Sequence, residues 1–98
     1  MSVCLELERI ERQQLLTAVF QPLADLRLGN VFGYEGLIRG PQGTPWHNPM
    51  ALFEAAEQCG CFQSLELLCR KVVVQAFVAQ RLPGKLFLNI SPDCQIGR

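Results

Sequence analysis

The sequence predicts an α/β fold in one domain or a piece of one, and the order of its segments supports this. Two segments rich in branched and aromatic residues, Thr17–Asp25 and Val31–Arg39, flank a turn marked by Gly29 and Asn30. The connection is too short for a parallel crossover, so the two strands should form an antiparallel hairpin. Two helical segments and a third strand follow, which is the order of a βα repeat leading into the next strand.

The residues before the hairpin are expected to form a lead helix. The segment from Val3 to about Leu16 carries Glu8 and Arg12 four residues apart, a spacing that supports an exposed helical face. Residues 1–16 are therefore assigned to an N-terminal lead helix and residues 17–98 to the domain that follows. Within the first strand, Pro22 cannot donate to a ladder, which predicts an edge, a bulge or a strand end.

A helix is predicted after the loop Gly40–Pro45. Asn48 can cap its amino end with its side chain, and Pro49 suits the first helical position. The helix should then run from Met50 to Cys59 and end at Gly60, which fits a C-terminal cap.

A longer helix is predicted from about Ser64 to Arg81. One stripe of apolar side chains recurs along it at helical spacing: Leu65, Leu68, Val72, Ala76 and Ala79. Pro83 and Gly84 should stop this helix. Lys85–Ser91 then reads as the third strand.

Composition narrows the class of protein. The chain has 98 residues, 49% of them hydrophobic and 18% charged, a mixture that suits a packed core rather than disorder. With a net charge of zero and no basic stripe, duplex nucleic acid is not an expected partner. No apolar run predicts a membrane span, and residues 1–12 lack the apolar centre of a signal peptide, so a cytoplasmic location is expected.

The cysteines are expected to be reduced thiols that act as small buried hydrophobes. Their number is odd and their spacing irregular: Cys4, Cys59, Cys61, Cys69 and Cys94. A zinc site built from Cys59, Cys61, Cys69 and His47 is the less favoured interpretation, because Cys-x-Cys lacks the usual ligand spacing.

The second strand has two faces with different chemistry. One face carries Gly33, Glu35, Leu37 and Arg39, and the other Phe32, Tyr34, Gly36 and Ile38. Spacing alone favours a half-buried strand with its charges in water. The sharper hypothesis is that Glu35 and Arg39 face a concave site, where they would offer an anionic oxygen and a phosphate-binding fork.

Asn89 poses a similar choice on the third strand, where it shares a face with Phe87. An asparagine on an apolar strand is costly to bury without partners. It could hydrogen-bond a neighbouring loop, or it could present its amide oxygen to a divalent ion such as Mg²⁺ or Mn²⁺.

Four ordered and correctly spaced blocks between about Thr17 and Asp93 resemble the opening part of an EAL-type cyclic-di-GMP phosphodiesterase domain. They are Phe20-Gln21-Pro22, then Gly33 to Arg39, then Pro49 with Leu52-Phe53 and Ala56-Glu57, and then Leu88 to Pro92.

The resemblance implies a modified (β/α)8 barrel of the TIM type whose first strand is antiparallel, with this chain as its N-terminal fragment. It implies hydrolysis of cyclic di-GMP to linear pGpG with Mg²⁺ or Mn²⁺. Glu35 and Asn89 stand where the family binds metal. Gln21, Leu37 and Arg39 stand where it contacts the substrate.

The chain also departs from the family pattern. Gly36 replaces the usual alanine, which should matter little because it points away from Glu35, and Gly40-Pro41 follows Arg39 where an aromatic residue is common. The later acidic ligands would lie beyond Arg98, so the intact domain is expected to be the enzyme. The 98-residue chain alone should be inactive and should self-associate through unpaired strands.

Two readings of function stay open from the sequence. The first is a cyclic-di-GMP phosphodiesterase, and the second is a catalytically degenerate EAL domain that serves as a cyclic-di-GMP receptor or protein-interaction module. The sequence also leaves open a homo-oligomer and an attached sensory or GGDEF-type domain in the parent protein.

Overall fold

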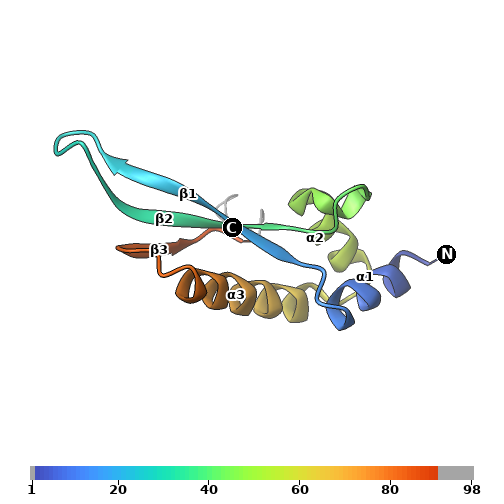
Figure 1. Ribbon diagram of the computed structural model, residues 1–98. Helices are drawn as coiled ribbons and strands as arrows, with labels where there is room; N and C mark the ends of the chain where they lie inside the picture. Colours follow the sequence, from blue (N-terminus) through green and yellow to red (C-terminus); the bar gives the residue numbers. More distant parts are fainter. Residues whose placement is uncertain (1, 91–98) are drawn as a thin grey trace.

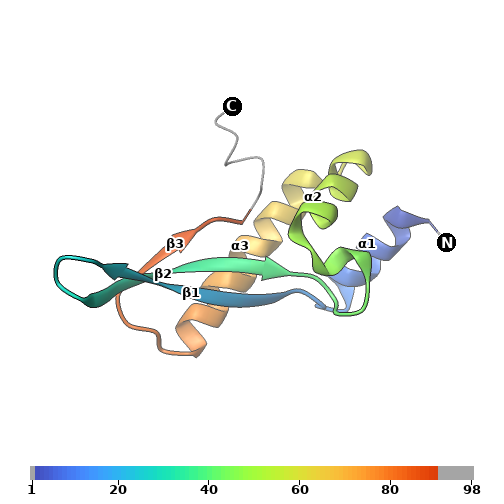
Figure 2. The ribbon, with the colours of Figure 1, turned by 90° about the horizontal axis from the view of Figure 1, so that it is seen from above.

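A computed structural model describes residues 2–90 of the chain as a mixed α/β structure (Figure 1). Its elements are, in order, α1 (Val3–Arg12), β1 (Thr17–Asp25), β2 (Asn30–Arg39), the 3-10 helix η1 (Pro45–His47), α2 (Pro49–Gln58), α3 (Phe62–Ala79) and β3 (Lys85–Leu88). Helix α3 runs beneath a three-stranded sheet, and α1 and α2 gather at the end opposite the hairpin turn (Figures 1 and 2). No helix within residues 2–90 has the length and apolar character needed to cross a membrane.

The sheet has the order β1-β2-β3. Strands β1 and β2 pair antiparallel from Thr17↔Arg39 to Asp25↔Asn30, which confirms the predicted hairpin. Strands β2 and β3 pair in parallel. Pro22 lies in β1, at the edge of this sheet and beside a register shift at Leu23, where a missing N–H donor is tolerated.

The prediction that the first helix reaches Leu16 is wrong, because α1 ends at Arg12. Gln14 adopts a left-handed conformation with φ of 55°, and the Leu15 N–H donates to the Ile10 carbonyl at 3.0 Å. This bond closes the helix end in the manner of a Schellman motif. The chain can then turn so that Leu16 enters the core, where 7% of it is exposed.

Helix α2 begins and ends through the residues expected to cap it. The Asn48 side chain accepts from the Met50 N–H at 2.8 Å, and Pro49 is the first helical residue. Gly60 follows the helix with φ of +75°, the left-handed conformation that glycine adopts without strain.

Helix α3 spans Phe62–Ala79, two residues earlier at each end than the predicted Ser64–Arg81. Arg81 has φ of 54°, and the Leu82 N–H donates to the Phe77 carbonyl at 3.4 Å. The backbone therefore leaves the helix before Pro83, for the same reason as at the end of α1.

Strand β3 is shorter than the predicted Lys85–Ser91 and ends at Leu88. Asn89 and Ile90 follow it outside the strand, and Ser91 lies outside the described residues.

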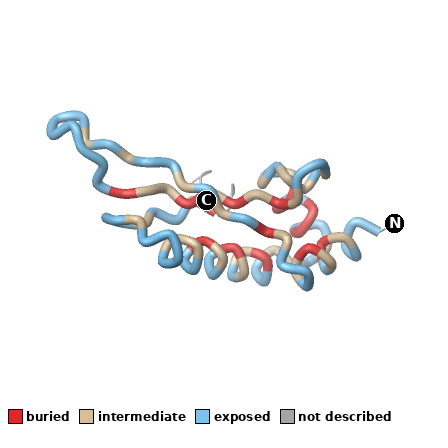
Figure 3. Tube along the Cα trace, viewed as in Figure 1, coloured by how far each residue is buried: buried red, intermediate tan, exposed pale blue. Residues whose placement is uncertain are grey.

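The core lies where the helices meet the end of the sheet (Figure 3). Its members come from α1, α2, α3 and β2: Leu7, Ile10, Leu52, Phe53, Ala55, Ala56, Leu65, Cys69, Val73 and Ile38, with Leu16 and Ile90 beside them. The predicted stripe on α3 is partly wrong. The fully buried row is Leu65, Cys69 and Val73, whereas Leu68 and Val72 are partly buried and Ala79 is exposed.

The expectation that the cysteines are all free thiols is also wrong. Cys4 at the start of α1 and Cys59 at the end of α2 form a disulfide, with their Cα atoms 5.7 Å apart. Cys69 is fully buried, as expected of a small hydrophobe, and Cys61 is partly buried. Cys94 lies outside the described residues.

Candidate functional site

The five predicted site residues belong to the face of the sheet that α3 does not cover. Helix α3 packs on the opposite face, where Phe77 meets the rings of Phe20 and Tyr34 at centroid distances of 5.8 and 6.4 Å. Gln21 pairs directly with Glu35 across the hairpin, and such partners point to the same side. Side chains alternate along β2, so Glu35 faces away from α3.

The structure brings Glu35 and Asn89 together. The parallel register pairs Glu35 with Phe87, so Asn89 comes two residues later, just past the end of β3. There the Asn89 side-chain amide Nδ2 donates to the Glu35 Oε2 at 2.5 Å, across 54 residues of sequence. Asn89 thus forms a hydrogen bond with a charged side chain on the neighbouring strand, which the loop alternative did not include. A carboxylate held by a charge-assisted hydrogen bond is fixed in orientation.

The pair of side chains suits part of the coordination sphere of a hard divalent cation. The Glu35 carboxylate and the Asn89 amide oxygen are the ligand types that Mg²⁺ and Mn²⁺ take. Two such oxygens do not complete a site. Within residues 2–90, no group of three or more His, Cys, Asp or Glu side chains is arranged to hold a metal ion.

The other three predicted residues lie along the same face at different places. Gln21 is exposed opposite Glu35, and Leu37 is half-buried one step further along β2. Arg39 ends the strand, about 13 Å from Glu35 at the usual rise of a strand. Its Nη1 donates to the Ile38 carbonyl at 2.8 Å, so the guanidinium lies against its own strand. The structure therefore groups Gln21, Glu35 and Asn89 and leaves Arg39 apart.

Gly36 has a packing role that the sequence did not reveal. A Cβ atom added to it would meet Val73 Cγ1 well inside 3.0 Å, a separation that real Cβ atoms essentially never show. Helix α3 thus touches the backbone of β2 directly behind Glu35. Val73, on the buried row of α3, supports the strand that carries the candidate ligands. The only sign of this packing in the sequence was the four-residue spacing of Leu65, Cys69 and Val73, which places them on one face of the helix.

A group of sulfur and carboxyl side chains lies apart from this face, between α1 and α2. A hollow of about 120 Å³ is lined by Cys4, Leu7, Glu8, Glu11, Cys59 and Cys61. Glu11 Oε1 is buried there without a hydrogen-bond partner, and burial, with the nearby Glu8 charge, raises the pKa of the Glu11 carboxyl.

The thiols near this hollow are poor nucleophiles at neutral pH. Burial and the Glu11 charge raise the pKa of the Cys61 thiol, and the same causes raise that of Cys69 to about 12. Cys59 is bonded to Cys4 and cannot serve as a thiolate ligand. His47 Nδ1 lies 3.1 Å from the Gly40 carbonyl oxygen, within a polar loop. The disulfide therefore removes Cys59 from the ligands that the zinc-site interpretation needs.

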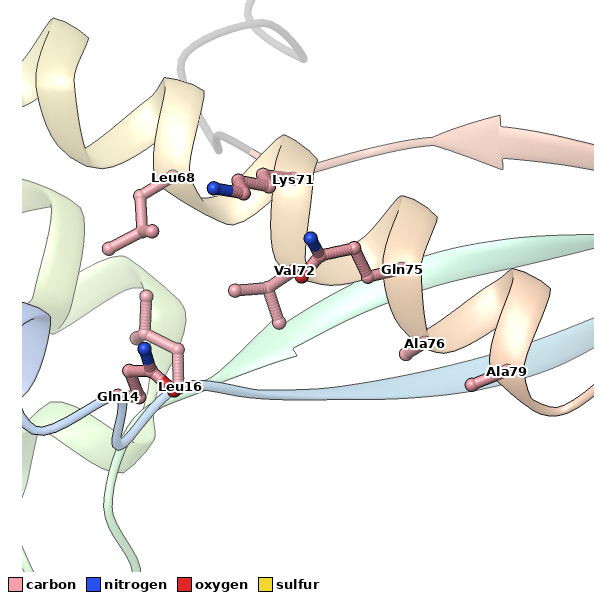
Figure 4. A pocket seen from close by; sticks show the side chains of 8 residues that line it. All are labelled: Gln14, Leu16, Leu68, Lys71, Val72, Gln75, Ala76 and Ala79. Carbon is pink, nitrogen blue, oxygen red and sulfur yellow. The ribbon is translucent and has the colours of Figure 1, made fainter.

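A larger hollow lies elsewhere on the molecule, away from the candidate site. It measures about 500 Å³ and opens between α3 and the start of β1 (Figure 4). Its walls are Gln14, Leu16, Leu68, Lys71, Val72, Gln75, Ala76 and Ala79. Four residues of the predicted apolar stripe of α3 thus line this hollow, and two of them, Leu68 and Val72, also pack against the core. None of the five predicted site residues lines it.

Comparison with protein-family models, with curated proteins and with solved structures finds no match to this chain. The function of the chain is therefore inferred from its sequence blocks and from the geometry around Glu35.

Proposed function

We propose that this chain is the N-terminal part of an EAL-type domain that hydrolyses cyclic di-GMP to linear pGpG. The observation that carries the proposal is the contact between Glu35 and Asn89. The sequence blocks that assign these two residues as metal ligands lie far apart in the chain, and their side chains meet at 2.5 Å on the sheet face that α3 does not cover. An arbitrary strand pairing would not be expected to join these two oxygen-bearing side chains.

The topology supports the proposal of a barrel fragment. An antiparallel strand pair comes first, and α2 and α3 then lead to a strand that is parallel to β2. That order suits a (β/α)8 barrel whose first strand is reversed. Asn89 also follows the carboxyl end of β3, the end at which barrel enzymes carry their sites.

In such a domain, the predicted site residues would have separate roles in binding the metal and the substrate. Glu35 and Asn89 would hold one side of a Mg²⁺ or Mn²⁺ site, with the hydrogen bond between them fixing the carboxylate. The bound metal would supply an activated water and neutralise phosphate charge. Arg39 would leave the Ile38 carbonyl and bind a phosphate oxygen through paired hydrogen bonds. Gln21, beside Glu35, would donate or accept at the substrate, and Leu37 would give apolar contact.

The setting of the domain belongs to the same proposal. We place it in the cytoplasm, while a homo-oligomer and an attached sensory or GGDEF-type domain in the parent protein stay open. In a reducing cytoplasm the Cys4–Cys59 bridge would be open to reduction by cellular thiols.

The test is hydrolysis of cyclic di-GMP by the parent protein, followed by chromatography of the product. Glu35→Gln should lose most turnover, because it removes the anionic metal ligand, while Glu54→Gln is the matched control on the exposed side of α2. Arg39→Ala should chiefly raise KM, and Arg70→Ala, an exposed arginine on α3, controls for loss of charge.

Full hydrolysis by Glu35→Gln would refute the metal assignment. A wild-type parent that binds cyclic di-GMP without turning it over would select the receptor reading instead.

A further inference from the structure

The turn of the β1–β2 hairpin is the most protruding part of the described chain. It extends past β3 and past the end of α3, away from the core (Figures 1 and 2). Two leucines occupy it, with Leu26 95% exposed and Leu28 73% exposed. A single exposed leucine is ordinary in a protein surface. Two exposed leucines at the protruding turn form an apolar surface at the point where a binding partner would first contact the protein.

The turn is held by its own hydrogen bonds, so these leucines are presented in a defined arrangement. Asp25 Oδ1 accepts from the backbone N–H groups of Arg27 at 2.8 Å and Leu28 at 3.2 Å. The Asp25 carbonyl accepts from the Gly29 N–H at 2.7 Å, and Gly29 has φ of +70°. The one carboxylate in the turn is thereby directed at the backbone, and Leu26 is left outside.

Apolar exposure continues behind the turn. Val31, Phe32 and Phe87 are each more than two-fifths exposed, and the rings of Phe32 and Phe87 meet edge to face at a centroid distance of 6.0 Å. The hairpin end therefore has an apolar apex backed by an aromatic pair.

The hairpin end has an excess of positive charge although the chain is neutral overall. It carries Arg27 in the turn, Lys85 paired with Gly33, and Arg81 just after α3, against the single carboxylate of Asp25. The opposite end carries acids on α1, α2 and the first turns of α3, but these helices also carry cations, which offset most of that negative charge: Arg9, Arg12, Arg70 and Lys71. An anionic surface would therefore attract the hairpin end more than the helical end.

We propose that the hairpin end docks on an anionic lipid bilayer, with Leu26 and Leu28 entering the headgroup boundary and Arg27, Arg81 and Lys85 facing the lipid phosphates. The turn projects as a narrow apex, and none of the hollows described above includes a turn residue, which favours a flat partner surface over a peptide held in a groove. A bilayer boundary accepts such an apex, and nearby cations add to the attraction of its apolar residues.

The test is cosedimentation of the 98-residue chain with vesicles of phosphatidylcholine alone or with about one third phosphatidylglycerol. We expect binding to the anionic vesicles, with each cation contributing about fivefold in partition. Leu26→Ser with Leu28→Ser should lower that partition at least about tenfold, since both side chains lose apolar burial. The matched control is Leu67→Ser, a 67% exposed leucine on α3, which should bind like the wild type.

Lys85→Gln with Arg27→Gln provides a second, independent variant that leaves the apolar apex intact. It should weaken binding to anionic vesicles, and added salt should weaken the binding of the wild type in the same way. Circular dichroism checks the fold of each variant.

Equal partition onto neutral and anionic vesicles would overturn the proposal, as would tip variants that bind like Leu67→Ser. If the tip substitutions change self-association in sedimentation velocity while vesicle binding is absent, the hairpin end is a protein contact and the lipid proposal is wrong.

Discussion

Replacement of Gly36 by alanine should destabilise this protein, although alanine suits a strand better than glycine does. The reason is the contact of the β2 backbone with Val73. An added methyl group would overlap Val73 Cγ1, while Leu86 Cδ1 and Phe20 Cε1 would lie at 3.4 Å, at the edge of ordinary contact. Val73 is thus the main obstacle, and it cannot move into solvent because it is fully buried.

The magnitude follows from two opposed effects. Overpacking a core typically costs about 1–3 kcal/mol. Replacing glycine where its conformation is compatible with alanine returns about 0.4–1 kcal/mol through the unfolded chain. We therefore expect Gly36→Ala to lower the free energy of unfolding by about 1–2 kcal/mol.

Val73→Ala is the partner substitution that makes the prediction specific. By itself it should cost about 2 kcal/mol through lost burial and a cavity. Together with Gly36→Ala it should cost less than the sum, because the new methyl group enters the space that Val73 vacates. The two substitutions should be coupled by about 1–2 kcal/mol, in the range found for residues in contact.

The assay is urea unfolding of the wild type, both single variants and the double variant, followed by circular dichroism. A control double-mutant cycle uses Val78→Ala, at an exposed position of α3, in place of Val73→Ala. It should show no coupling between Val78→Ala and Gly36→Ala. Strictly additive effects of Gly36→Ala and Val73→Ala would refute the reasoning, since they would mean that the two side chains do not compete for the same space.

Two further predictions concern the region between α1 and α2. Burial raises the folded-state pKa of Glu11, so stability should increase as the pH falls through that pKa toward the ordinary value of 4.5. Glu11→Gln should abolish this increase and raise the free energy of unfolding at pH 7 by less than about 1 kcal/mol after solvent screening; unchanged pH dependence relative to the exposed Glu54→Gln would contradict it. The Cys4–Cys59 bridge spans 55 residues, so Cys4→Ser with Cys59→Ser should cost up to about 4 kcal/mol by the chain-entropy relation. Equal urea midpoints for this variant and the oxidised wild type would show that the bridge does not restrain the unfolded chain.

The parts of the fold that the sequence predicted are those governed by local chemistry. The hairpin follows from a connection too short for any other pairing, and α2 follows from Asn48, Pro49 and Gly60. The ends of α1 and α3 were misjudged for one reason. Gln14 and Arg81 adopt the left-handed conformation that normally marks glycine, so composition gave no stop signal there.

The remaining features of the fold and of the candidate site depend on contacts between residues far apart in the sequence, which the sequence pattern does not reveal. Spacing placed Glu35 and Arg39 on one face of β2, but only the parallel register brings Asn89 to Glu35. After Leu65, which belongs to both, the buried row of α3 lies one position away from the predicted stripe, because the helix rests on Gly36, a contact that periodicity cannot reveal. The Cys4–Cys59 pair was missed because an odd number of irregularly spaced cysteines and an expected reducing compartment both favoured free thiols.

The disulfide also has a topological consequence. Because it joins Cys4 to Cys59, residues 4–59 form a closed covalent ring that contains the whole hairpin. A protease that cuts once at the exposed turn, for example after Arg27, would open this ring without releasing a fragment. Both pieces would stay tethered through α1 and α2, and the strands could remain paired. The nicked, oxidised protein should thus stay in one disulfide-linked piece, with two new chain ends at the hairpin turn, far from the old amino terminus.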